Sequence, residues 1–217
     1  MSNHDRLTAA LVALTDKRAN GENLPSMEQI AETAGVELSV AREVFTDEKE
    51  LMIAVAEVAM TKLVDWSTRN VVAVDPEDPI EQMIALGYAY LDFAFADLPT
   101  FRVINDRRYV DFIAQPRLNR YVDAMRRLVL GLIERARAIG RLASDDDTDL
   151  LLLAARSYVY GLARMAADDH FREWVPETEP LELSKRAFRD YIERVVGDNS
   201  SAAARETRER PAPVSGG

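Results

Sequence analysis

The stretch "SMEQIAETAGVELSVAREVF", residues 26–45, decides the fold. Ser26 stands three residues before Gln29, which is capping-box spacing and predicts a helix that begins at residue 27. Gly35 ends this helix, because glycine readily takes the left-handed conformation of a sharp turn. A second short helix is predicted for residues 38–44. The stretch therefore predicts two short helices joined by a tight turn.

Small and branched apolar residues recur through both helices at spacings that can lock them together. They are Ile30, Ala31, Ala34, Val36, Val40 and Val44. Two helices packed in this way across a tight turn form a helix-turn-helix, whose second helix enters the major groove of DNA.

The rest of the chain shows helical periodicity and no convincing run of alternating polar and apolar residues. Further helices are predicted at residues 5–16, 48–70, 80–95, a short one after Pro99, 116 to about 139, 150–167 and 181–196. The sequence therefore predicts an all-α protein.

Three parts are predicted along the chain. Residues 1–64 form a helix-turn-helix DNA-binding domain, with its motif at 26–45, and residues 65–197 form a larger helical bundle for ligand binding and dimerisation. Residues 198–217 are small, polar and punctuated by proline and glycine, which predicts a disordered tail.

Composition narrows the class of protein. The 217 residues are 47% hydrophobic and 29% charged, as expected of a globular chain with a proper core. The absence of cysteine excludes disulfides and cysteine-ligated metals. The net charge of −10 argues against a wide basic surface for nucleic acid but is compatible with a small local patch.

The sequence shows no membrane signal. The first residues, "MSNHDRL", lack the basic and then apolar run of a signal peptide. The most apolar region, residues 150–167, is interrupted by Arg156 and Arg164 and is too short to cross a bilayer. We expect a cytoplasmic protein without a membrane partner.

The stretch at 26–45 resembles the helix-turn-helix of the TetR/AcrR family of bacterial transcriptional regulators. The matching features are Ser26, Ile30-Ala31, Ala34-Gly35-Val36, and Phe45 followed by "TDEKEL". The segment "YLDFAFADLPTFRVI", residues 90–104, also resembles part of the ligand-binding domain of one TetR branch. The resemblance implies a ligand-responsive repressor that binds operator DNA as a homodimer, with two reading helices roughly 34 Å apart.

The chain departs from the family pattern in the charge of its reading head. Glu37, Glu43 and Glu48 stand where the family usually has hydroxyl or basic residues. Residues 26–51 hold seven acids against only Arg42 and Lys49. Since affinity for DNA comes largely from phosphate neutralisation, operator binding is predicted to be weak or salt-sensitive.

DNA contacts are predicted at a few positions. Ser39, Val40 and Arg42 would lie closest to the groove, and Ser26 and Lys49 would meet flanking phosphates. Core packing is an equally good interpretation of Val40. The alternative function is a dimeric small-molecule sensor or protein-interaction module whose helix-turn-helix no longer binds DNA.

The second domain suggests an effector and a dimer interface. An unidentified small-molecule effector is predicted to bind between helices, near Tyr88, Phe101, Tyr109 and Met125. Residues 150–167 are apolar on nearly every side, which fits either a central helix of one bundle or a helix shared with a second subunit. We expect a homodimer formed through the Leu150–Ala167 and Leu181–Val196 helices.

Catalytic and metal sites are not expected. The chain has no nucleophile elbow, phosphate-cradling loop or dinucleotide fingerprint, so no cofactor is predicted and the protein is not expected to be an enzyme. Asp168, Asp169 and His170 are consecutive, so their side chains should diverge rather than share a metal ion.

Overall fold

The structure, a computed structural model, describes residues 1–17 and 23–209, with side chains described as far as residue 197. Ten helices and no strands occur in these ranges. They are α1 (Asn3–Asp16), α2 (Met27–Ala34), α3 (Leu38–Val44), α4 (Glu48–Val72), α5 (Pro79–Ala96), α6 (Leu98–Ile104), α7 (Pro116–Ala138), α8 (Thr148–Ala167), α9 (Phe171–Trp174) and α10 (Pro180–Glu209).

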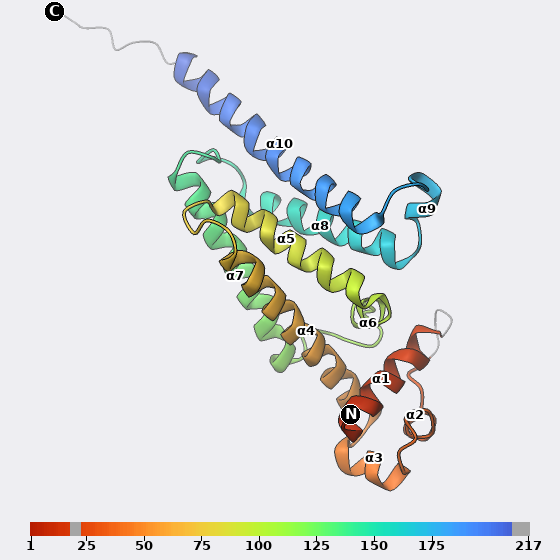
Figure 1. Cartoon of the computed structure of the whole chain (residues 1–217). Coiled ribbons are helices and arrows are strands. Elements are labelled where there is room, and N and C mark those ends of the chain that lie inside the picture. Colours follow the sequence, from red (N-terminus) through yellow and green to blue (C-terminus); the bar gives the residue numbers. More distant parts are fainter. Residues whose placement is uncertain (18–22, 210–217) are drawn as a thin grey trace, which may run out of the picture.

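Helices α1, α2 and α3 form a small head at one end of the molecule (Figure 1). Leu7 and Leu11 of α1, Ile30 of α2 and Ala41 of α3 are all fully buried, so one apolar core holds the three helices together. The head joins the rest of the molecule through α4, whose N-terminal turns belong to this core. The predicted boundary between residues 64 and 65 falls inside α4, which is one continuous helix.

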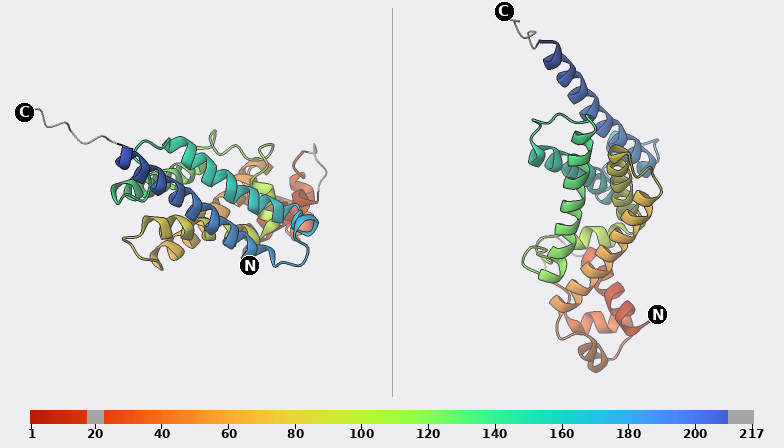
Figure 2. Two further views of the ribbon diagram at one scale, coloured as in Figure 1. Left: turned by 90° about the horizontal axis from the view of Figure 1, so that it is seen from above. Right: turned by 90° about the vertical axis from the view of Figure 1, so that its left-hand side faces the viewer.

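The larger part is a bundle arranged around α5. This helix packs against α4, α7, α8 and α10, and most of its residues are buried. Figure 2 shows an elongated arrangement in both views, with the head at one end and the far end of α10 at the other. Gly87 lets α10 approach closely, since a Cβ atom at this position would lie 1.9 Å from Cε1 of Phe188.

The predicted all-α class is confirmed, and the main helices lie where the sequence placed them. Two differences occur near the C-terminus. The short α9 was not predicted, and α10 continues to Glu209 instead of ending near Val196. Residues 198–209, predicted to be disordered, are thus helical here, because Ala202–Ala204 and the Arg and Glu residues after them favour helix. Residues 210–217 lie outside the described range.

Within residues 1–17 and 23–209, no helix combines the length and the apolar character needed to cross a bilayer.

Candidate nucleic-acid interface and effector site

The turn between α2 and α3 has the predicted helix-turn-helix geometry. Ser26 caps α2: its Oγ accepts from Gln29 N at 3.4 Å, and Gln29 Oε1 accepts from Ser26 N at 3.0 Å. Gly35 ends α2 at φ 61° and ψ 41°, a left-handed conformation that glycine adopts readily and residues with a Cβ atom adopt rarely. Arg6 of α1 donates to the Gly35 carbonyl at 2.5 Å and so fixes the turn to the first helix.

Helix α3 has distinct inner and outer faces. Ala41 is fully buried, and the half-buried Leu38 and Val44 pack against the core. Ser39, Arg42 and Glu43 are exposed on the opposite face. Val40 is half-buried and, in contrast to its neighbours Leu38 and Val44, is not part of the core cluster. The outer face is therefore Ser39, Arg42 and Glu43, with Val40 at its edge.

The cation of this outer face is paired within the head. Arg42 Nη2 lies 2.6 Å from Glu28 Oε1 of α2, and both side chains are more than half exposed. The pKa of Glu28 is held below its ordinary value, first by its own backbone N–H and then by Ser26 and Arg42. Exposed ion pairs of this kind are weak, so a DNA phosphate can compete with Glu28 for Arg42.

Three of the acids near the motif have structural roles. Glu48 Oε1 accepts from Met27 N at 2.7 Å, which places this carboxylate at the N-terminus of α2. Asp47 caps α4 by accepting from Glu50 N at 2.8 Å. Glu50 accepts from both the hydroxyl and the amide of Thr46, and these bonds lower its pKa. These acids stabilise helix ends, where negative charge is favourable.

Glu37 and Glu43 have no such role in the described part of the chain. Both are exposed, and neither side chain makes a hydrogen bond or an ion pair there. Glu37 is the N-cap residue of α3 but forms no side-chain cap. Lys49 is exposed on the first turn of α4 and has no ion pair within the same ranges. The exposed surface around α3 and the start of α4 therefore carries two cations, Arg42 and Lys49, and two anions, Glu37 and Glu43.

Several contacts at this surface were not foreseen from the sequence. Arg6 meets the turn from 29 positions away, and Glu28 and Glu48 contact Arg42 and Met27 across 14 and 21 positions. Only the order of the helices in space brings these pairs together. The capping role of Asp47 has a local signal, since Glu50 follows it at capping-box spacing.

The predicted effector residues lie in different surroundings. Phe101 is fully buried and packs edge-on against Tyr90, with ring centroids 6.0 Å apart. Tyr88 points toward α10, where its hydroxyl accepts from Arg189 Nε at 3.1 Å. Tyr109 is half-buried against the core, and Met125 lies half-buried on α7. The surface has two open grooves, and none of these four residues lines either of them.

The two grooves lie in different parts of the molecule and carry different charges. One, of about 480 Å³, lies beside the turn and is bordered by Glu28, Glu32 and Glu37. The other, of about 420 Å³, lies between α4 and α7 and contains Lys62, Arg117 and Arg120. The two grooves therefore differ in sign of charge.

Helix α8 has an apolar outer face. Val159, Ala163 and Ala167 are buried against the bundle, whereas Leu150 and Leu153 are 63% and 64% exposed. The helix is therefore at the surface of this chain and is not a central helix of one bundle. Farther along α8, Tyr158 stacks on Tyr191 of α10 with ring centroids 4.5 Å apart.

The consecutive acids and histidine after α8 pair with separate neighbours. Asp168 accepts from Arg164 at 2.8 Å, Asp169 lies 3.4 Å from Arg172, and His170 lies 3.2 Å from Glu173. Their side chains point in different directions, as the sequence predicts.

A three-helix head with a helix-turn-helix, continued by a long helix into a larger bundle, defines the two-domain, all-α architecture of a transcriptional regulator. The family profile described as "Tetracyclin repressor-like, C-terminal domain" matches residues 83–193, just over half of the chain. The chain belongs to this TetR family of ligand-responsive transcriptional regulators.

Solved structures show the same fold over most of the chain. A protein of unknown function from Rhodococcus sp. RHA1 has a TM-score of 0.68 at 23% identity, covering 89% of this chain and 95% of its own. The TetR family transcriptional regulator PfmR from Thermus thermophilus gives 0.67 at 18%, covering 87% and 97%. The regulator FadR from Bacillus subtilis, in complex with stearoyl-CoA, gives 0.66 at 13%, covering 88% and 98%. No curated protein matches the sequence.

Proposed function

We propose that this protein is a homodimeric repressor that binds its operator weakly and in a salt-sensitive way. The observation that supports this most directly is the outer face of α3, where Ser39 and Arg42 are exposed while Ala41 is fully buried. In the complex, Ser39, Val40 and Arg42 face the major groove. Ser26 and Lys49 meet phosphates beside it.

The charges of the head set how strongly salt weakens the complex. Arg42 and Lys49 supply two cations in each head and four in a dimer. Neutralising four phosphates gives a slope of log affinity against log salt of about −3 to −4. The complex is therefore salt-sensitive, although its slope is smaller than that of DNA-binding proteins that contact about six to ten phosphates, because each head supplies few cations.

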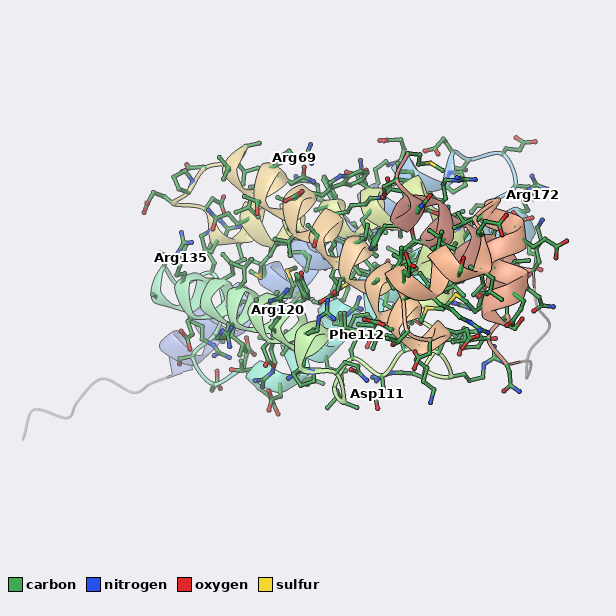
Figure 3. The ribbon with its side chains drawn as sticks, turned by 90° about the horizontal axis from the view of Figure 1, so that it is seen from below. Arg69, Asp111, Phe112, Arg120, Arg135 and Arg172 are labelled. Atoms are coloured by element: carbon green, nitrogen blue, oxygen red, sulfur yellow. The ribbon has the colours of Figure 1, made fainter. Side chains whose placement is uncertain are left out.

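The test is fluorescence anisotropy with duplex DNA from the region upstream of the gene, at low salt. Arg42→Ala should weaken sequence-dependent binding about tenfold, since it removes a contact from each head. Arg69→Ala is the matched control, because Arg69 lies at the far end of α4 from the head (Figure 3). Binding that is absent at low salt, or that falls equally in both variants, would contradict the proposal.

The second candidate is a dimeric sensor or protein-interaction module that no longer binds DNA. The side chains of Glu37 and Glu43, which have no partner among the described residues, and the Arg42–Glu28 ion pair favour it. The triple variant Glu37→Gln, Glu43→Gln, Glu48→Gln separates the two candidates. A wild type that binds no duplex, together with a triple variant that does, would support the sensor.

Dimerisation is proposed through the outer face of α8 together with α10. Leu150 and Leu153 are exposed on α8, and Tyr158 of α8 stacks on Tyr191 of α10. Apolar side chains of this kind are what subunits bury when they associate. Light scattering should give a dimer mass for the wild type and a monomer mass for Leu150→Glu, Leu153→Glu. The control is Val72→Glu, at a more exposed apolar site at the end of α4, and a wild-type monomer would overturn the interface.

The bundle is proposed to respond to a small-molecule effector. Tyr88, Phe101, Tyr109 and Met125 remain our candidate contacts within it. Effector binding favours one of two arrangements of the bundle, and α4 carries this difference to the head. Operator affinity then changes because the separation of the two reading helices changes.

A further inference from the structure

A groove between the long helix that carries the head and the bundle contains an excess of positive charge. Val58, Thr61 and Lys62 line it from α4, and Arg117, Arg120 and Tyr121 line it from α7. Its volume of about 420 Å³ falls in the range of small-molecule sites. Figure 3 shows Arg120 on α7 where this helix runs alongside α4.

One carboxylate in the groove is already matched by a cation. Glu57 of α4 accepts from Arg117 Nε at 2.9 Å and from Nη2 at 2.5 Å, and its side chain is only 17% exposed. This two-point ion pair joins the two helices and neutralises both charges. Arg117 is therefore not the group that an incoming anion would bind first.

Lys62 and Arg120 are the cations left over. Neither has a carboxylate partner within the described residues, although the whole chain carries a net charge of −10. With Glu57 and Arg117 neutralised, the groove has a charge of about +2. The complementary ligand is an anion.

Polar and apolar contacts define the rest of the groove. Arg120 Nη2 donates to the Tyr121 hydroxyl at 3.2 Å, and its guanidinium lies 4.9 Å from the centre of that ring. These contacts hold Arg120 in place and leave its other N–H groups for a ligand. The hydroxyls of Thr61 and Tyr121 lie 3.3 Å apart, and Val58, 43% exposed, offers an apolar surface. The site fits an oxyanion attached to a small apolar body.

We propose that this groove is a second effector site, separate from the aromatic one in the bundle, and that it binds the carboxylate or phosphate group of a small amphipathic molecule, held between Lys62 of α4 and Arg120 of α7. The bound oxyanion adds a second link between the two helices, beside the Glu57–Arg117 pair. Only the regulatory consequence rests on the proposed function: the link favours one orientation of α4, and hence of the head, relative to the bundle.

Isothermal titration calorimetry on the full-length protein tests the site with octanoate and octyl phosphate. Octanamide is the neutral probe of similar length. At least one anion should bind, and octanamide should bind at least tenfold more weakly. If octanoate alone binds, the oxyanion is a carboxylate, and if octyl phosphate alone binds, it is a phosphate ester.

Single variants locate the binding. Lys62→Gln and Arg120→Gln should each weaken the anion about tenfold, whereas Arg172→Gln, which removes the same charge from a distant exposed site, should have no effect. Melting temperatures by circular dichroism should agree among the three variants, which excludes misfolding as the cause. Failure of both anions to bind, or equal loss in all three variants, would overturn the site.

DNA binding measured in parallel distinguishes this inference from the proposed function. If the protein binds operator DNA but no anion, the anion site is wrong and the proposed repressor function is retained. If the protein binds an anion through Lys62 and Arg120 but does not bind DNA, the anion site is supported and the repressor function is wrong.

Discussion

Arg102 of α6 binds the carboxylate of Asp16 on α1 at two points, with Nε–Oδ1 at 2.6 Å and Nη2–Oδ2 at 2.8 Å. Its remaining nitrogen, Nη1, donates to the Ala167 carbonyl at the end of α8, at 2.6 Å. One side chain therefore joins the head to two helices of the bundle. The hydrogen bond from Arg102 to Asp16 raises the pKa of Arg102, so the guanidinium stays charged.

Arg102→Ala is expected to lower the free energy of unfolding by about 1.5–3 kcal/mol, because it removes partly buried, charge-assisted hydrogen bonds. Arg107→Ala is the matched control. Arg107 lies 3.6 Å from Asp111, both side chains are well exposed, and its loss should cost less than about 0.5 kcal/mol. Urea titration measures both changes, and equal values would show that the Arg102 bonds contribute no special stability.

Gly87→Ala is expected to destabilise the protein by about 1–3 kcal/mol, because the new Cβ atom would overlap the Phe188 ring. The control is Gly131→Ala on α7, where a Cβ atom meets nothing within 4 Å. There the loss of backbone freedom in the unfolded chain should make the protein about 0.5–1 kcal/mol more stable.

A double-mutant cycle assigns the Gly87 effect to this contact. In a Phe188→Ala background the added methyl group has room, so Gly87→Ala should cost far less than it does alone. Thermal unfolding of the four proteins supplies the cycle. Strictly additive losses would mean that Phe188 is not what excludes a side chain at Gly87.

The stability of the bundle should depend on pH through Glu81. Arg189 donates to both of its carboxylate oxygens, at 2.6 and 2.9 Å, and these bonds lower the pKa of Glu81 below its ordinary value of 4.5. Since the folded-state pKa is the lower one, this stabilisation is present above pH 4.5 and is lost as the pH falls through the folded pKa.

Glu81→Gln isolates this contribution. The wild type should be more stable than the variant at pH 7 by up to about 1 kcal/mol, a modest value because the pair is about one-third exposed. The difference should shrink as the pH falls below 4.5 and through the folded-state pKa of Glu81. A difference that stayed constant with pH would attribute the effect to packing and not to charge.

Local sequence was enough to predict those parts of the head that depend on neighbours within a few residues. The Ser26–Gln29 capping box and the left-handed Gly35 are examples, since both are set within one turn of helix. Apolar periodicity predicted the long helices because it, too, depends on residues three or four positions apart in the sequence. The four-residue α9 escaped prediction because one turn is too short to show a period.

Contacts between distant residues could not be read from the sequence. The pairing of Arg42 with Glu28 depends on how α3 crosses α2, and the groove cations Lys62 and Arg120 meet only because α7 returns along α4. Among the seven acids near the motif, the sequence singled out Glu37, Glu43 and Glu48 as unfavourable for DNA. The structure separates them, because Asp47, Glu48 and Glu50 stabilise helix ends whereas Glu37 and Glu43 do not.

Glu48→Gln should strengthen operator binding. The Glu48 carboxylate lies at the N-terminus of α2, where it accepts from Met27 N at 2.7 Å and opposes a phosphate near Ser26. A glutamine keeps an oxygen acceptor for this amide but removes the charge, so the fold is retained while the repulsion is lost. Glu48→Ala, which also removes the acceptor, should lower the melting temperature where Glu48→Gln does not.

The measurement is anisotropy with operator DNA at several salt concentrations. If Glu48 acts by repelling phosphate, the gain from Glu48→Gln should be several-fold at low salt and should fade as the salt concentration rises, because added ions screen exposed charges. Glu177→Gln, at an exposed site in the loop between α9 and α10, controls for the change in net charge. An equal gain in both variants would show that the overall charge of −10, and not the position of Glu48, limits affinity.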